Sequence, residues 1–226
     1  WMARNVLAKE KVLFHGHPIA AVAARTEEIA ERACELIEVE YDIHPWAIEI
    51  DDAIKPDAPI LHDFIKFDGK PSNIAGTLEH KKGDIEKGFK EADIIIEREF
   101  ETAAVHQGYL ETHACLVSVS PDDRTTIWSS SQGQFMVRAM TSFITGIPQS
   151  SIRAIPAEIG GGFGGKTIVY LEPVATILSK KSGRPVKMVM TREEVMRASG
   201  PTSGSKSKVK ILSLIHISEP TRRPII

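Results

Sequence analysis

The chain has 226 residues, of which 42% are hydrophobic and 26% are charged, and its formal net charge is −2 at pH 7. This composition predicts a folded chain with a hydrophobic core and argues against a disordered tail or a broad nucleic-acid-binding face. The two cysteines, Cys34 and Cys115, are too few for a disulfide framework and lie outside any C-x-x-C pair, so buried free thiols are expected. No early apolar run is typical of a signal peptide or a membrane span, and the simplest expected location is the cytoplasm.

The first 50 residues predict short strands and one helix. Val12–Phe14 and Ile19–Ala24 have strand-like composition. Thr26 is a predicted helix N-cap, because two glutamates follow it in the first turn and apolar residues then recur with helical spacing. Val39–Tyr41 returns to a strand pattern. Residues 1–50 are therefore expected to form a small α+β domain.

Residues 51–83 contain repeated prolines and glycines, which predict a linker over the surface. The elements predicted after it are a helix over Asp84–Ala92, a strand over Ile94–Thr102, hairpin strands over Leu116–Ser120 and Thr125–Ser130, a helix over Gln134–Ile144, a strand over Ser151–Pro156, a helix over Leu171–Lys181 and a strand over Val186–Met190. This mixed order, with at least one hairpin, favours an α+β fold over a uniformly parallel sheet.

Both ends of the chain have unusual sequence. The chain opens abruptly at Trp1, and residues 212–226 resemble the translated read-through of a sequencing adapter. This segment is therefore expected to be a non-native tail, although a short terminal strand followed by a basic tail is the alternative. The second domain is expected to run from residue 84 to residue 211 and to be truncated at its C-terminal end.

Gly160–Thr167 places five glycines around a single aromatic residue, Phe163. The segment matches the P-loop pattern, in which Lys166 and Thr167 would reach phosphate and magnesium, and also the G-x-G-x-x-G pattern of dinucleotide folds. Neither pattern has its acidic partner, because the later strand ends in Thr191-Arg192 and no acid lies about 20 residues beyond the glycines. Since glycine permits close approach of the backbone, the segment still predicts a ligand-binding loop.

Two further segments carry candidate polar side chains. The sequence Tyr-Leu-Glu-Thr-His over Tyr109–His113 precedes a predicted strand, and Gln132 lies between a strand and a helix, where it could also cap that helix. His106 and His113 are expected to be structural histidines. Glu111 is expected to be a buried structural carboxylate, with a nearby arginine as its candidate partner.

In their order and spacing, these three motifs resemble the molybdenum-binding subunit of the xanthine dehydrogenase and aldehyde oxidase family. Residues 16–24, with the following helix and strand, resemble the family's α/β hammerhead domain, and the resemblance covers residues 11–211. It implies an α+β architecture in which a truncated hammerhead domain over residues 1–50 precedes the first part of a molybdopterin-binding domain over residues 84–211.

The resemblance also implies a role for each matching residue. The amide of Gln132 would donate a hydrogen bond to an oxygen ligand of molybdenum, and Phe163 would shield the metal from water. The other residues implied to bind the cofactor are Gly161, Gly162, Gly164 and Gly165. Thr167 lies on the substrate side, where purine-oxidising members carry a glutamate, so a purine substrate is disfavoured. An aldehyde, an aromatic heterocycle, an aromatic thioester and carbon monoxide stay open.

The implied enzyme is a molybdenum hydroxylase that transfers water-derived oxygen to an aldehyde or a (hetero)aromatic substrate. Its molybdenum–pyranopterin cofactor could carry a cytosine dinucleotide, and electrons would pass to iron–sulfur clusters and FAD on partner subunits, in a dimer of heterotrimers. The family's general-base glutamate is expected beyond the end of this chain, so no catalytic residue is assigned and the fragment alone is expected to be inactive. Glu172, Glu193 and Glu194 do not match that motif. A P-loop nucleotide-binding protein and a non-catalytic binding module are the alternative functions.

Overall fold

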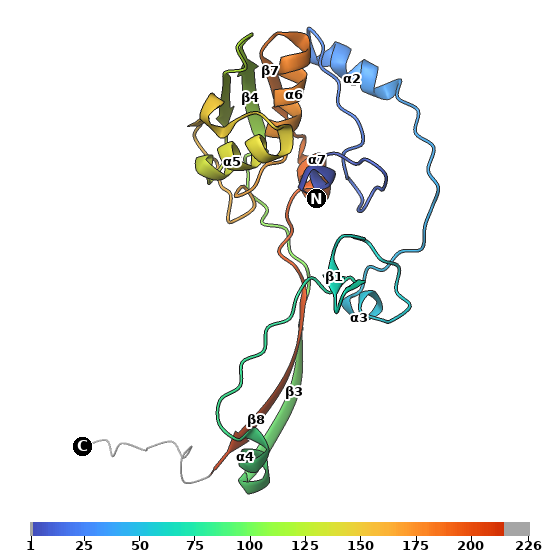
Figure 1. Ribbon diagram of the computed structural model, residues 1–226, viewed down its shortest axis with the longest axis vertical. Helices are drawn as coiled ribbons and strands as arrows, with labels where there is room; N and C mark the ends of the chain where they lie inside the picture. Colours follow the sequence, from blue (N-terminus) through green and yellow to red (C-terminus); the bar gives the residue numbers. More distant parts are fainter. Residues whose placement is uncertain (1, 215–226) are drawn as a thin grey trace, which may run out of the picture. The chain divides into compact units, whose positions relative to one another are not determined.

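A computed structural model describes residues 2–214 of the chain (Figure 1). The chain divides into two compact units. One unit contains the chain up to Ile43 together with Val105–Thr202, and the other contains His44–Ala104 and the chain from Ser203 onward. Helices and strands are mixed in both units, which confirms the predicted α+β class. No helix among the described residues is long and apolar enough to cross a membrane.

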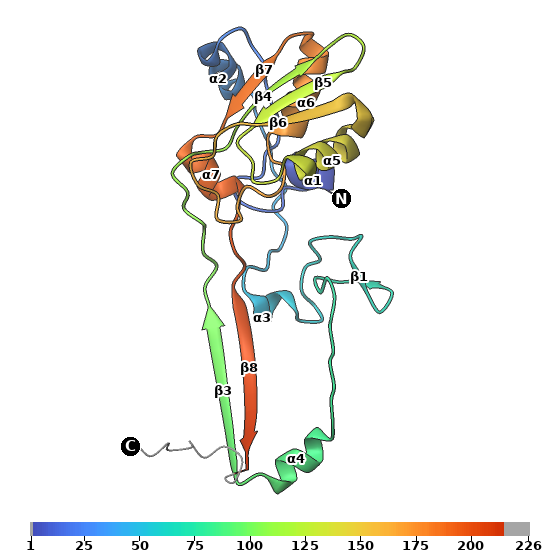
Figure 2. The ribbon, with the colours of Figure 1, turned by 90° about the vertical axis from the view of Figure 1, so that its left-hand side faces the viewer.

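The first unit is built on a four-stranded sheet (Figure 2). Its strands are β4 (Ala114–Val119), β5 (Thr125–Ser129), β6 (Ile152–Pro156) and β7 (Val186–Val189), in the spatial order β6-β5-β4-β7. Strand β4 pairs antiparallel with both β5 and β7, whereas β5 and β6 are parallel. The connection between β5 and β6 contains α5 (Gln134–Thr145) and the short 3-10 helix η1 (Gln149–Ser151). Strands β5, β6 and β7 therefore end at the same edge of the sheet, and β4 begins there.

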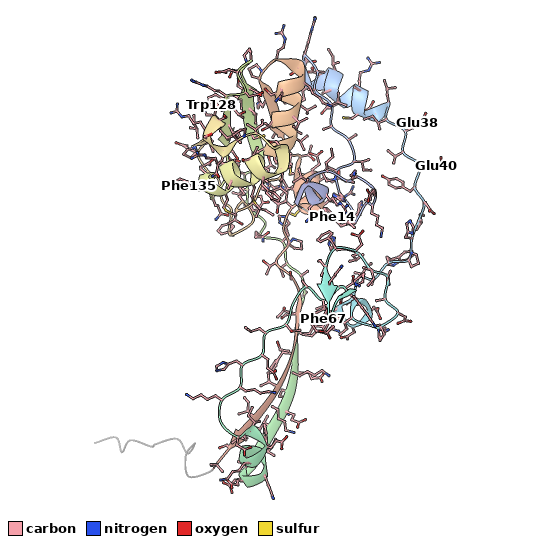
Figure 3. The ribbon with its side chains drawn as sticks, viewed as in Figure 1. Phe14, Glu38, Glu40, Phe67, Trp128 and Phe135 are labelled. Carbon is pink, nitrogen blue, oxygen red and sulfur yellow. The ribbon has the colours of Figure 1, made fainter. Side chains whose placement is uncertain are left out.

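One face of this sheet forms the main hydrophobic core. Along β4 and β5 every second residue is buried, and Val117 and Ile127 are fully buried. Val137 of α5 and Ala175 of α6 (Glu172–Ser182) belong to the same core cluster, so both helices cover this face. The opposite face carries the paired residues Leu116 and Trp128, which are partly exposed (Figure 3).

Two helices of the first unit end within one residue of their predicted C-termini. Helices α5 and α6 both stop at a glycine in the left-handed conformation, Gly146 and Gly183, whose N–H groups bond back to the preceding turn. Helix α7 (Arg192–Ala198) begins after its N-cap Thr191 with a capping box in which the Glu194 side chain accepts from the Thr191 backbone. Helix α1 (Met2–Val6) and helix α2 (Glu27–Glu35) complete the unit.

The second unit is dominated by a two-stranded antiparallel ribbon of β3 (Ile94–Thr102) and β8 (Ser205–Ser213). Its other elements are α3 (Ile50–Ala53), the strands β1 (Lys66–Phe67) and β2 (Lys70–Pro71), and α4 (Ile85–Glu91). Helix α3 and the β1–β2 pair lie in the segment expected as a linker, where the amide of Asn73 donates to the carbonyls of Ala53 and Pro59.

The two faces of the ribbon differ in chemistry. On one face the register places three glutamates of β3 opposite three lysines of β8, namely Glu97 with Lys210, Glu99 with Lys208 and Glu101 with Lys206. The other face carries Ile94, Ile96, Phe100, Val209 and Ile211, together with Arg98 opposite Val209. Opposite charges at directly facing positions favour this register over one shifted by a residue.

Several predictions for the N-terminal segment are wrong. Helix α2 is confirmed, with the Thr26 hydroxyl accepting from Ile29 N, but Val12–Phe14, Ile19–Ala24 and Val39–Tyr41 are not strands. A strand needs a neighbour to satisfy its backbone groups, and none lies beside these segments within residues 2–214. Cys34 is exposed, because α2 has no buried residue, whereas Cys115 is buried as predicted.

Strand β8 is not predicted by its sequence pattern. Its sequence alternates lysine with small or apolar residues, which is a weak strand signal, and β3 supplies the partner that makes it a strand. Leu212 and Ser213, assigned to the expected read-through tail, pair with β3. The rest of that predicted tail, from residue 215 to residue 226, lies outside the described residues.

Candidate functional site

The predicted site segments meet at one edge of the four-stranded sheet. Gln132 follows the carboxyl end of β5, and the glycine loop follows the carboxyl end of the adjacent parallel strand β6. Tyr109–His113 lies just before β4, which begins at the same edge, and α7 follows β7 there. The topology therefore brings together segments from four distant parts of the sequence.

Gln132 is bonded directly to the glycine loop. Its side-chain Oε1 accepts from Gly164 N at 3.0 Å and from Lys166 N at 3.2 Å, and its backbone N donates to Lys166 O at 2.9 Å. Ser131 adds a hydroxyl hydrogen bond to the same carbonyl, at 3.0 Å. Because Oε1 is engaged, the amide NH₂ of this exposed residue is left as a donor, without a partner among residues 2–214.

Two glycines allow the loop to pack against its neighbours. A Cβ atom at Gly162 would lie 2.5 Å from Oε1 of Gln132, and one at Gly165 would lie 2.6 Å from the Tyr109 ring. Neither position has room for a side chain. The glycine content of the loop is therefore explained by close approach, in addition to backbone freedom.

The centre of the loop presents donors without acceptors. The backbone N–H groups of Gly161, Gly162 and Phe163 make no hydrogen bond within the described part of the chain, whereas those of Gly160, Gly164, Gly165 and Lys166 all do. Phe163 has φ +48° and is 75% exposed. A non-glycine residue in the left-handed region is strained, and such strain is typical of functional loops.

Lys166 is fully buried and does not face solvent. Its Nζ donates to Glu111 Oε2 at 2.5 Å and lies 5.0 Å from the centroid of the Tyr109 ring. A P-loop lysine must reach a bound phosphate, but this ammonium group is already held by a carboxylate. In addition, α6 begins at Glu172, five residues beyond Thr167, so no helix N-terminus follows the loop directly. These features do not support the P-loop interpretation.

Behind the loop lies a buried hydrogen-bond network. The Tyr109 hydroxyl contacts His113 Nε2 at 2.7 Å and Ser199 Oγ at 2.9 Å, and the His113 ring packs edge-on against Tyr170. Burial, followed by the positive charge of Lys166, lowers the pKa of His113 to about 4. His113 is therefore neutral near pH 7 and has the structural role predicted for it.

The other candidate polar residues also have structural partners. His106 accepts from Gly108 N, as expected of a structural histidine. Glu111 pairs with Lys166, so the suggested arginine partner is wrong. Arg192 instead donates to the carbonyls of Tyr109 and Leu110 and fixes the segment that carries Glu111.

The three glutamates left out as catalytic bases are engaged elsewhere. Glu172 accepts from Ser129 Oγ and from Tyr170 N, Glu193 pairs with Arg197, and Glu194 completes the α7 cap. Among residues 2–214 there is no cluster of three or more histidine, cysteine, aspartate or glutamate side chains that could hold a metal ion.

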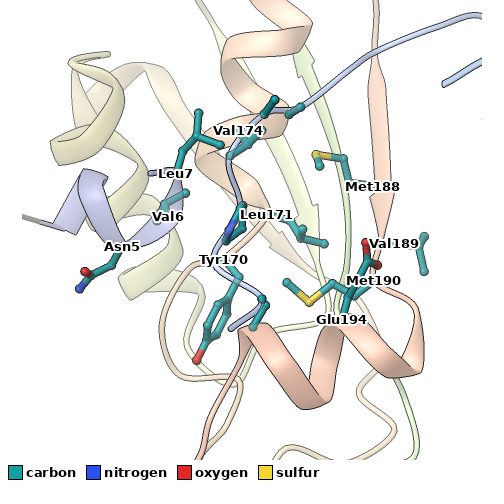
Figure 4. Close-up of a pocket in the computed structure, with 15 residues that line it drawn as sticks. Asn5, Val6, Leu7, Tyr170, Leu171, Val174, Met188, Val189, Met190 and Glu194 are labelled. Atoms are coloured by element: carbon teal, nitrogen blue, oxygen red, sulfur yellow. The ribbon is translucent and has the colours of Figure 1, made fainter. Parts of the chain in front are cut away.

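A cavity of about 240 Å³ lies elsewhere in the first unit (Figure 4). It is lined mainly by apolar side chains of the N-terminal segment and of residues 170–174 and 188–190, including Leu171, Val174, Met188 and Met190. None of the predicted site residues lines it. The glycine loop and Gln132 therefore do not contribute to this cavity.

Family models match most of the chain. Residues 66–212 match the molybdopterin cofactor-binding domain, and residues 2–45 match the aldehyde oxidase and xanthine dehydrogenase a/b hammerhead domain. The chain belongs to the xanthine dehydrogenase and aldehyde oxidase family of molybdenum hydroxylases. This membership confirms the resemblance inferred from the three motifs.

Similar molybdenum hydroxylases include a probable xanthine dehydrogenase subunit from Bacillus subtilis (strain 168), which is 37% identical over 85% of this chain and 25% of its own length. The carbon monoxide dehydrogenase large chain of Hydrogenophaga pseudoflava is 38% identical over 84% of this chain and 25% of its own. The chain spans about a quarter of the length of these relatives.

Solved structures of molybdenum hydroxylases have the same fold. A crystal structure of Cu,Mo-CO dehydrogenase has a TM-score of 0.80 and 31% identity, over 93% of this chain and 28% of that one. Quinoline 2-oxidoreductase from Pseudomonas putida 86 has a TM-score of 0.83 at 24% identity, over 92% of this chain and 26% of that one, and this supports the fold alone.

Proposed function

We propose that the glycine loop and Gln132 form part of the molybdenum cofactor pocket of a hydroxylase. The observation that carries this proposal is the set of donors left over at the loop, namely the amide NH₂ of Gln132 and the three N–H groups of Gly161, Gly162 and Phe163. Neutral donors of this kind suit the oxygen atoms of a metal-bound or phosphate group, because they bind without adding charge. The residues present therefore fit the cofactor of the family.

Each residue has a distinct task in this proposal. The amide of Gln132 donates to an oxygen ligand of the metal, and Gly162 lets the loop backbone reach Gln132. The ring of Phe163 covers the metal side of the pocket and excludes water, which strengthens each polar contact inside. When bound, the molybdenum cofactor supplies the redox chemistry that adds water-derived oxygen to the substrate.

We propose an aldehyde, a (hetero)aromatic compound or carbon monoxide as the class of substrate. The Thr167 hydroxyl donates to Gly164 O at 3.0 Å. It carries no charge, so it cannot bind a purine ring as a carboxylate would. Relatives of the chain are named for xanthine and for carbon monoxide, and family membership alone does not choose between these substrates.

The proposed electron path leaves this subunit. Iron–sulfur and FAD subunits are proposed as partners in a cytoplasmic dimer of heterotrimers, because similar proteins are named as a subunit or a large chain of an enzyme. The cofactor is proposed in the pyranopterin form, with or without a cytosine dinucleotide. No general base is assigned to Glu172, Glu193 or Glu194, since each already serves the fold.

The test is the molybdenum and pterin content of the full-length gene product. The wild type should contain both in near-equimolar amounts. Gly162→Ala should lower both by at least about tenfold, because the new methyl group displaces Oε1 of Gln132 from the loop. Gly76→Ala is the matched control, since a Cβ atom there meets nothing within 4 Å. Absence of molybdenum and pterin from the wild type would sink the proposal.

A further inference from the structure

The two ends of the glycine loop meet on a single oxygen atom. Glu111 Oε2 accepts from Gly160 N at 2.9 Å, at the start of the loop, and from Lys166 Nζ at 2.5 Å, at its end. The backbone of Glu111 also donates to Gly160 O at 3.1 Å. Glu111 thus closes the loop although it lies 55 residues before Lys166 in the sequence.

Lys166 connects this closure to Gln132. Its backbone N and O are both bonded to Gln132, and its side chain extends to Glu111. Lys166 therefore links Glu111, whose carboxylate binds Gly160 N, to Gln132, whose amide oxygen binds Gly164 N. The unpaired N–H groups of Gly161, Gly162 and Phe163 lie between these two anchors.

The ammonium group of Lys166 and the carboxylate of Glu111 differ in burial, so removal of each should have a different effect on the loop. The Lys166 side chain is 0% exposed, whereas that of Glu111 is 32% exposed. A buried ammonium group without a counter-charge is strongly destabilising, whereas a carboxylate that reaches water can be hydrated. Loss of the carboxylate should therefore damage the loop more than loss of the ammonium group.

We propose that Glu111 and Lys166 are positioning residues, whose ion pair holds the glycine loop in the shape that presents its free N–H groups to the cofactor. This inference rests on the proposed function for its biological role. In it Lys166 is not a ligand, because its Nζ is enclosed by Glu111 and Tyr109.

Hydrogen exchange of the cofactor-free full chain tests the structural half of the proposal. The variants are Glu111→Gln, Lys166→Met and the double variant, and Lys180→Met is the control because Lys180 pairs with Asp123 away from the loop. The hydrogen-bonded amides of Gly160, Gly164 and Lys166 should exchange about tenfold faster in Glu111→Gln, because the glutamine removes the counter-charge of the buried Lys166 ammonium group. The change should be smaller in Lys166→Met, and the double variant should lie closer to the wild type than Glu111→Gln does. Amides of β4 should be unaffected in all variants.

Cofactor content tests the functional half. In the full-length protein, molybdenum and pterin should fall by about 10- to 100-fold in Glu111→Gln and less in the double variant. If the wild type contains no cofactor, the proposed function fails while the exchange experiment still decides whether the pair holds the loop. If the wild type contains cofactor, unchanged loop exchange and unchanged cofactor content in the variants would overturn the positioning role.

A different order of effects would identify another role for Lys166. If Lys166→Met lost the most cofactor and the double variant recovered nothing, the lysine would act through its charge on the ligand, and the proposal would be wrong. Should Glu111→Gln fail to unfold cooperatively, Lys166→Met and the double variant still carry the test, since neither leaves a buried unpaired ammonium group.

Discussion

The four-stranded sheet and the β3–β8 ribbon come from the same chain but are stabilised in different ways. In the sheet, alternate residues of β4 and β5 are buried and contact α5 and α6. In the ribbon, all nine residues of β3 are exposed, including Ile94, Ile96 and Phe100 at about half of their surface. Burial of apolar surface therefore stabilises the sheet, whereas backbone pairing and cross-strand charges set the geometry of the ribbon.

This difference explains where a precise site can form. The glycine loop and Gln132 are held by segments that leave the buried sheet, and their contacts are made to backbone atoms or enclosed side chains. Elements anchored in a close-packed core keep their positions to a fraction of an ångström, as a cofactor pocket requires. The exposed ribbon offers no comparable anchor within the described residues.

The largest expected contrast is between two isoleucines. Ile127→Ala in β5 removes a fully buried side chain and should lower the free energy of unfolding by about 2–5 kcal/mol. Ile96→Ala in β3 removes a half-exposed side chain and should change it by no more than about 0.5 kcal/mol. Urea unfolding of the full chain, followed by circular dichroism, measures both. If the two variants lost equal free energy of unfolding, the face of the ribbon that carries Ile96 would be covered in solution.

Acid should weaken the sheet unit through His113. The folded pKa of His113 is about 4, below its ordinary value of 6.5, so unfolding takes up a proton between these two pH values. The contribution of neutral His113 is present above pH 6.5 and is lost as the pH falls toward 4. By about pH 4.5 the loss should be about 2–3 kcal/mol.

Unfolding curves at about pH 7.5 and about pH 4.5 measure this effect. His113→Gln should show a smaller difference between the two pH values than the wild type. Burial also lowers the pKa of His17, which acts in the same direction and is unchanged in the variant. An identical pH dependence in the two proteins would show that His113 titrates normally.

The smallest effect is expected from the charge pairs of the ribbon. Glu99 and Lys208 lie 3.0 Å apart but are both largely exposed, so water and salt screen their attraction. In a double-mutant cycle with alanine, their coupling should be the weakest of the effects described and should fall further in about 0.5 M salt, roughly five times the ionic strength at which the Debye length is ~10 Å. A coupling that resists salt would indicate that the pair is shielded from solvent.

Sequence patterns predicted most of the sheet unit because its elements are locally consistent. Helices α5 and α6 lie within one residue of their predicted bounds, and β4 and β5 form the predicted hairpin. The predictions failed where strand identity depends on a distant partner. Val12–Phe14 has strand composition but no neighbour among residues 2–214, whereas β8 has a weak pattern and becomes a strand opposite β3.

In the candidate site, too, some features follow from the sequence and others only from the tertiary structure. The sequence by itself determined the family, since Tyr109–His113, Gln132 and the glycine loop are motifs defined by residue type and spacing. It also indicated that the loop binds a ligand, because glycine has no side chain to prevent close approach. Only the tertiary structure decided the role of Lys166. The order of the strands brings Lys166 against Glu111, and whether a lysine faces a ligand or a carboxylate of the protein depends on that contact and not on the residues beside it.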